Sequence, residues 1–168
     1  ILFGSIVRGK EKPSDIDILL LFSSKENTDI TYSFRKLLEQ FSILFTVIPK
    51  TYASLLSESF PAKESILAEG YSLITHTSIA ASFGYAPFIL FLYKLTGFTQ
   101  SKRMLFQYSL QGRYKNQGML ARLQLIKFSD SILLSPISSS DEVKEYLSSW
   151  KITFEEMPVL FPKRVSLK

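Results

Sequence analysis

The first 22 residues, ILFGSIVRGKEKPSDIDILLLF, constrain the fold most, because two apolar runs flank a polar, glycine-containing turn. Residues 1–3 and 15–22 have the composition of strands, and we expect a short helix over residues 5–10 between them. The second run is apolar enough for a central strand, yet it contains Asp15 and Asp17. Successive side chains of a strand point to opposite faces, so both carboxylates project from one face.

Asp15 and Asp17 are candidate metal ligands and catalytic residues. At a separation of about 4 Å and an effective dielectric of about 20, two carboxylates repel each other by about 4 kcal/mol. Mg²⁺ offsets such repulsion and prefers carboxylate oxygens together with water and phosphate oxygens, and a two-metal site can act in phosphoryl transfer. In the structural alternative, Asp15 completes the turn that Pro13 begins, and Asp17 is exposed on an edge strand.

Gly4 and Ser5 are candidates for binding phosphate. A glycine between a strand and a helix lets the backbone approach a ligand, and the first N–H groups of the helix bind anions. Arg8 and Lys10 add positive charge nearby. In the alternative interpretation, Ser5 is an ordinary helix cap.

The segment GSIVRGKEKPSDIDILL resembles the signature of the nucleotidyltransferase superfamily that includes DNA polymerase beta, especially its minimal nucleotidyltransferase branch. The later segment ILAEGYSLI, residues 66–74, resembles the helix, glycine and strand that close such domains. The resemblance covers residues 1–75. It implies an α/β (α+β) nucleotidyltransferase fold, with a mixed sheet flanked by helices.

The resemblance also implies a chemistry for the site. Asp15 and Asp17 would ligate Mg²⁺, and Gly4 and Ser5 would hold the nucleotide phosphates. Arg8 would lie beside the phosphates and organise the loop. The reaction would move a nucleoside monophosphate from a nucleoside triphosphate, with ATP as the expected donor, to an acceptor such as RNA, DNA or a partner protein.

One position departs from the family pattern. Active members supply a third carboxylate from a later strand, but residues 42–49 contain none, and Thr46 lies about where that acid is expected. Glu39, Asp130 or Asp141 could supply it only if folding brought one of them to Asp17. The alternative function is therefore a weakly active or inactive nucleotide-binding module, comparable to one component of a two-protein toxin-antitoxin pair.

The rest of the first domain, residues 1–76, reads as alternating helices and strands. Asp29 is the expected cap of a helix whose apolar stripe packs on the sheet. Further expected elements are a strand over 42–48, helices over 52–56 and 61–69, and a strand over 71–75. The stripe consists of Phe34, Leu37, Leu38 and Phe41.

The second region, residues 85–168, is predicted to be basic and α+β. No acidic residue lies between Glu69 and Asp130, and the stretch interleaves cations with aromatic residues, which suggests a polyanionic partner. Arg113 and Lys115 are the candidate nucleic-acid phosphate contacts; alternatively, the aromatic residues form core and the cations an exposed face. The expected elements are a helix over 86–95 and a small C-terminal β-α-β extension: strand 131–135, helix 141–150 with a capping box at Ser139 and Glu142, and strand 152–161.

Composition excludes several other site classes. The chain has no cysteine and one histidine, His76, so disulfides, thiolate metal sites and histidine-rich zinc sites are ruled out. The uncharged run over 70–93 is interrupted by polar residues, which argues against a membrane span, and a cytoplasmic location is expected. Because residue 1 already lies in an expected strand, we expect the domain to extend before it.

Overall fold

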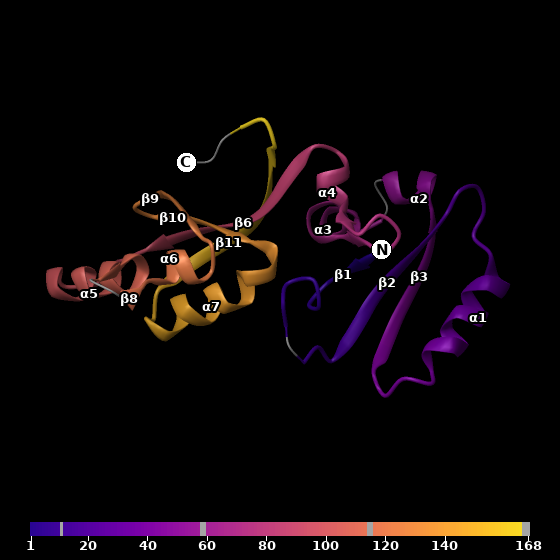
Figure 1. Cartoon of the computed structure of the whole chain (residues 1–168), viewed down its shortest axis with the longest axis horizontal. Helices are drawn as coiled ribbons and strands as arrows, with labels where there is room; N and C mark the ends of the chain where they lie inside the picture. Colours follow the sequence, from indigo (N-terminus) through magenta and orange to yellow (C-terminus); the bar gives the residue numbers. More distant parts are fainter. Residues whose placement is uncertain (11, 58–59, 114–115, 166–168) are drawn as a thin grey trace. The chain divides into compact units, whose positions relative to one another are not determined.

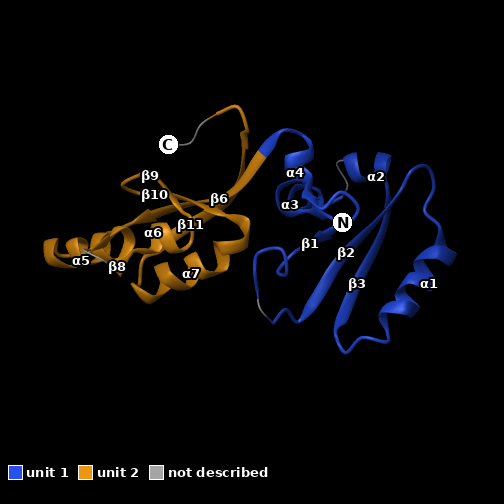
Figure 2. Cartoon of the chain, in the orientation of Figure 1, with its two compact units in different colours: residues 1–85 blue, residues 86–168 orange. Residues whose placement is uncertain are grey.

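The computed structural model describes residues 1–10, 12–57, 60–113 and 116–165. The chain divides into two compact units, unit 1 over Ile1–Tyr85 and unit 2 over Ala86–Lys168 (Figure 2). Each unit has its own sheet and its own helices (Figure 1). Within the described ranges, no helix combines the length and the apolar character that crossing a bilayer requires.

Unit 1 contains a five-stranded sheet in the order β3-β2-β1-β4-β5. Strands β2 and β3 are parallel, whereas β1 is antiparallel to β2 and to β4, and β4 is antiparallel to β5. The sheet is therefore mixed, which confirms the predicted α/β (α+β) class. The strands are β1 (Leu2–Phe3), β2 (Asp15–Phe22), β3 (Leu44–Thr51), β4 (Tyr71–Ser72) and β5 (Thr77–Ser78).

The helices of unit 1 begin at side-chain caps in three cases. Asn27 caps α1 by accepting a hydrogen bond from the backbone N–H of Ile30, and Thr51 and Ser54 form a capping box at α2. Asp29, the predicted cap of α1, lies in its first turn instead, where its charge favours the helix dipole. The helices are α1 (Thr28–Leu38), α2 (Tyr52–Leu56), α3 (Lys63–Glu69) and α4 (Ile79–Ser82), which Ser78 caps.

The core of unit 1 lies on one face of the sheet. Leu19 of β2 packs with Phe3, Leu55 of α2 and Ile66 of α3, and Leu21 packs against this cluster. Leu19 and Leu21 alternate along β2 in phase with Asp15 and Asp17, so they share a face with the two aspartates. The same sheet face is thus apolar toward the C-terminal end of β2 and acidic at its start.

Three local predictions for unit 1 are wrong. Residues 5–9 form successive turns and not a helix, since Gly9 has φ +86°. Leu37 and Phe41 of the predicted stripe are 62% and 55% exposed. Strand β4 ends at Ser72, because the chain turns there into β5.

Unit 2 contains a four-stranded sheet in the order β11-β6-β10-β9, and β6 is antiparallel to β10. Strand β6 therefore lies between β10 and β11, the two strands of the predicted β-α-β extension. Its strands are β6 (Tyr85–Lys94), β9 (Ile126–Ser129), β10 (Ile132–Pro136) and β11 (Thr153–Pro162). The helices are α5 (Gln100–Gln111), α6 (Met119–Arg122) and α7 (Ser140–Ser149), a 3-10 turn η1 (Ile137–Ser139) precedes α7, and β7 (Gly112–Arg113) pairs with β8 (Asn116–Gln117).

The helix predicted over residues 86–95 is a strand, β6. An uninterrupted apolar run has no period that separates a buried helix from a buried strand. In the structure Ile89, Phe91 and Tyr93 are buried in alternation, and β6 pairs with β10 from Phe88 onward. Pro87 precedes this pairing, so its missing N–H removes no hydrogen bond from the ladder between β6 and β10.

An aromatic cluster forms the centre of unit 2. Phe106 of α5 is fully buried and contacts Tyr93, Tyr146 and Trp150 at ring-centroid distances of 5.7, 5.8 and 5.5 Å. The predicted capping box before α7 is absent, because Ser139 closes the 3-10 turn η1 and caps α7 without a side-chain hydrogen bond.

Candidate active site

Asp15 and Asp17 lie on β2, the strand between β1 and β3. In the parallel pairing Asp15 lies opposite Leu44 and Asp17 opposite Thr46, and in the antiparallel pairing Asp17 lies opposite Phe3. Both carboxylates are half-buried. The structural alternative, in which Asp17 is exposed on an edge strand, is thus not observed.

Gly4 lies directly against Asp17. A Cβ atom built on Gly4 would be 2.5 Å from Asp17 Oδ2 and 3.5 Å from its Cγ, and the backbone of Gly4 has φ +79°. Both features disfavour a side chain at this position, since real Cβ atoms essentially never approach that closely and L-residues rarely adopt that φ. Glycine therefore lets the end of β1 pass within contact distance of the Asp17 carboxylate.

The two carboxylates interact electrostatically. Partial burial raises the pKa of Asp17 above its ordinary value, and the nearby charge of Asp15 raises it further, whereas the charge of Arg8 lowers it. The hydroxyl of Ser14 donates a hydrogen bond of 3.0 Å to Asp15 Oδ1. A cation at Asp17 would relieve both the desolvation and the repulsion, so the electrostatics fit the binding of a hard metal ion.

The segment after Gly4 is a compact series of turns. The Gly4 carbonyl accepts hydrogen bonds from the N–H groups of Val7 and Arg8, at 3.1 and 3.4 Å, and the Ser5 carbonyl accepts one from Lys10 at 3.2 Å. Across the described ranges, no hydrogen bond uses the backbone N–H of Ser5 or of Ile6. Two adjacent amide donors beside an acidic strand can hold phosphate oxygens without a helix N-terminus.

Arg8 is held by a residue far along the chain. Its Nη1 donates to Glu69 Oε2 at 2.9 Å, and the two side chains are 29% and 11% exposed. Glu69 is the last residue of α3, so the ion pair ties the turn after β1 to that helix. Sequence reasoning missed Glu69, because no local motif marks it; its one sequence signal is its place as the last acid before the long acid-free stretch.

The described part of the chain contains no group of three or more histidine, cysteine or acidic side chains that could hold a metal ion. Thr46 is exposed at the position beside Asp17 on β3. Of the carboxylates considered, Glu39 follows α1, whereas Asp130 pairs with Lys127 and Asp141 with Lys144. Glu39, the one of these three in unit 1, forms no such group with Asp15 and Asp17.

Arg113 and Lys115, the predicted nucleic-acid contacts, belong to unit 2. Arg113 is on the exposed strand β7, and its guanidinium lies over the ring of Tyr108 at 4.7 Å from the centroid. Lys102 lies similarly over Phe98 at 4.0 Å. Lys115 lies outside the described residues.

Comparison with known protein families finds a match for the first part of the chain. Residues 1–70 match the model of a family described as nucleotidyltransferase domain. This match confirms the resemblance seen in the opening motif, and it supports nucleotidyl transfer as the general chemistry of unit 1. The chain matches no curated protein and no solved structure.

Proposed function

We propose that unit 1 binds a nucleoside triphosphate through Mg²⁺ at Asp15 and Asp17 and transfers its nucleoside monophosphate to an acceptor. One observation carries the proposal: Gly4 brings the turn after β1 to within contact of the Asp17 carboxylate, so the amides proposed to hold phosphate would adjoin the proposed metal ligands. ATP is the expected donor.

Each residue has a distinct role in this proposal. The N–H groups of Ser5 and Ile6, with the Ser5 hydroxyl, orient the phosphates, and Arg8, fixed by Glu69, supplies positive charge beside them. The carboxylates of Asp15 and Asp17 are the metal ligands. A bound divalent ion would neutralise charge on the transferred phosphoryl group and on the leaving oxygen. Two carboxylates suffice for a hard cation that keeps water and phosphate oxygens as its remaining ligands.

A second candidate is a nucleotide-binding module with little or no transfer activity. The observation that favours it is the exposed Thr46 beside Asp17, at the position where the family pattern expects a third carboxylate. Without a base near the acceptor hydroxyl, the nucleotide can be held while the acceptor is poorly activated.

Calorimetry with a non-hydrolysable triphosphate analogue tests the metal site. We expect binding in Mg²⁺, and we expect its loss in EDTA and in the Asp15→Asn, Asp17→Asn double variant. Asp29→Asn is the matched control, because Asp29 is an exposed aspartate of the same unit. Equal affinity in EDTA and in Mg²⁺ would refute the metal site.

Label transfer from ATP separates the two candidates. Incubation with labelled ATP and with RNA or protein acceptors should give Asp17-dependent labelling if unit 1 is an enzyme. Thr46→Asp places a carboxylate beside Asp17 and should raise the transfer rate, whereas Ser42→Asp, at an exposed position before β3, should not. If neither the parent nor Thr46→Asp transferred label to any acceptor, the result would support the non-catalytic module.

We further propose a nucleic acid as the acceptor. The support is the stretch without acidic residues between Glu69 and Asp130, which contains Arg113. Binding of single-stranded RNA or DNA should weaken between low and moderate salt, since phosphate contacts release counterions. Binding that does not change with salt would refute this acceptor class.

A further inference from the structure

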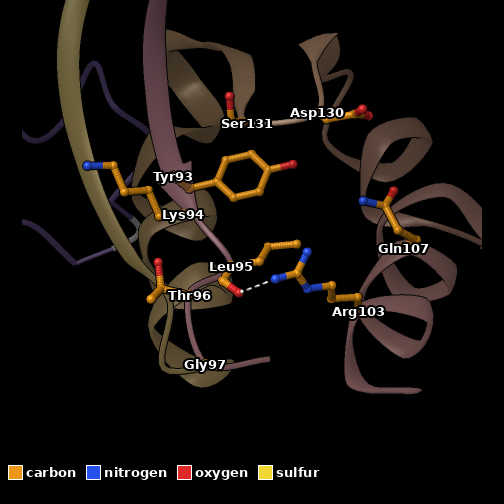
Figure 3. A pocket seen from close by; sticks show the side chains of 9 residues that line it. All are labelled: Tyr93, Lys94, Leu95, Thr96, Gly97, Arg103, Gln107, Asp130 and Ser131. Carbon is orange, nitrogen blue, oxygen red and sulfur yellow. Dashed lines mark hydrogen bonds between the residues drawn. The ribbon is translucent and has the colours of Figure 1, made fainter. Parts of the chain in front are cut away.

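Unit 2 contains an open pocket of about 730 Å³ between the end of β6, the segment after it and α5. Figure 3 shows the ring of Tyr93 projecting from β6 into the pocket, between Ser131 on one side and Leu95 on the other. The pocket is large enough for a nucleotide, because ligand sites commonly enclose about 300–1,000 Å³. The remaining lining residues are Lys94, Thr96, Gly97, Arg103, Gln107 and Asp130.

Two polar atoms of the pocket residues are buried without a partner among the described residues, the hydroxyl of Tyr93 and Oε1 of Gln107. The Tyr93 side chain is 0% exposed, and its hydroxyl points toward α5, which carries Gln107 (Figure 3). An unpaired buried polar group costs about 1–3 kcal/mol, and such costs persist in proteins where a ligand or a buried water supplies the missing partner. Burial raises the pKa of Tyr93 to about 12, which keeps its phenol protonated as a hydrogen-bond donor.

Arg103 supplies a cation at the same pocket. Its Nε donates to the carbonyl of Phe98 at 3.2 Å and its Nη2 to the carbonyl of Leu95 at 3.4 Å, the contact drawn in Figure 3. These two bonds orient the guanidinium over the segment that follows β6. The side chain is exposed, so it can still bind an anionic group at the mouth of the pocket.

We propose that this pocket binds a nucleoside monophosphate whose base presents an amino group next to a ring-nitrogen acceptor, as adenine and cytosine do. The Gln107 oxygen would accept from the amino group, and the Tyr93 hydroxyl would donate to the ring nitrogen. The Arg103 guanidinium would hold the phosphate. The neutral amide and the phenol inside the pocket suit a base, and the cation at the mouth of the pocket suits the phosphate of the same nucleotide.

The site is independent of the proposed metal site in unit 1, so its test uses the full chain with Asp15→Asn and Asp17→Asn, in EDTA. Calorimetric titration with AMP should show binding. IMP has a carbonyl in place of the amino group and a protonated ring nitrogen in place of the acceptor, so it loses both proposed base contacts, and its titration should show an affinity roughly tenfold or more lower.

Variants assign the contacts. Tyr93→Phe and Gln107→Met should each weaken AMP binding roughly threefold to tenfold. Arg103→Gln should weaken AMP binding by roughly tenfold or more and leave adenosine binding unchanged, because it removes a charged contact to phosphate. Arg122→Gln, on α6 outside the pocket, is the charge-matched control.

Three results would overturn the proposal: no AMP binding at millimolar concentration, equal affinity for AMP, IMP and inorganic phosphate, or equal AMP affinity in the parent and the pocket variants. A melting curve for each variant verifies folding. Tyr93→Phe removes no hydrogen bond within the described structure, so it keeps the test valid if another variant fails to fold.

Discussion

Gly4→Ala should destabilise unit 1 through a contact with the Asp17 carboxylate. The new Cβ would lie 2.5 Å from Asp17 Oδ2, and the backbone would remain at φ +79°. Holding alanine in the left-handed region costs about 1–2 kcal/mol. Displacing the carboxylate adds about 0.5–1.5 kcal/mol, the usual cost of moving a side chain off its preferred rotamer, because the clashing atom is the far end of a half-buried side chain. The total loss in unfolding free energy is then about 1.5–3.5 kcal/mol.

Gly84→Ala separates the two terms. Gly84 belongs to the same unit and has the same φ, +79°, but a Cβ there would meet nothing within 4 Å. It therefore reports the backbone cost alone, about 1–2 kcal/mol. Urea unfolding of the parent and the two variants gives the difference that belongs to the contact with Asp17.

A double-mutant cycle tests the contact itself. In an Asp17→Ala background the nearest atom of residue 17 to the new Cβ is Asp17 Cβ, at an ordinary 3.7 Å. Gly4→Ala should then cost no more than Gly84→Ala, which leaves a coupling free energy of about 0.5–1.5 kcal/mol in the cycle. Equal costs for the two glycine variants in the parent, or an unchanged cost of Gly4→Ala without the carboxylate, would refute the reasoning.

Three further variants test the site and the pocket. The pKa of Asp17 is raised in the folded state, so protonation of Asp17 adds to the stability of the fold as the pH falls through that raised pKa, and this contribution is absent at neutral pH. In EDTA, Asp17→Asn should therefore melt at or above the parent temperature at pH 7. Its melting temperature should also rise less on acidification than that of the parent. A variant that melted well below the parent at pH 7 would contradict this. Arg8→Gln leaves the Glu69 carboxylate, 11% exposed, without this partner and should lower the free energy of unfolding in urea by about 1–2 kcal/mol. Adding Glu69→Gln should recover part of this loss. No recovery would show that the two side chains do not stabilise the fold through their ion pair. Tyr93→Phe should leave the melting temperature unchanged or raise it. Tyr146→Phe loses a 2.6 Å hydrogen bond to a serine of α5 and should lower the free energy of unfolding by about 1 kcal/mol. If Tyr93→Phe were the more destabilising of the two, the Tyr93 hydroxyl would have a hydrogen-bond partner in the fold.

The opening motif could be read from the sequence because its information is local. Alternation along one strand places Asp15 and Asp17 on the same face, and the Gly-Ser turn follows directly from the preceding strand. Where local signals competed, prediction failed: Asn27 and not Asp29 caps α1, because either residue type can cap and the better-placed side chain prevails.

The sequence by itself determined the acidic face, the need for glycine at a strand end, and the similarity of the first 70 residues to a nucleotidyltransferase domain, because these depend on residue type and spacing. Tertiary structure alone decided that residues 85–94 pair as a strand and that Arg8 meets Glu69, since both depend on which distant segment supplies the partner. It also decided that the Tyr93 hydroxyl is buried beside α5 with no hydrogen-bond partner among the described residues. Periodicity can mark a face for burial, but it does not specify which distant segment covers that face or supplies a hydrogen-bond partner.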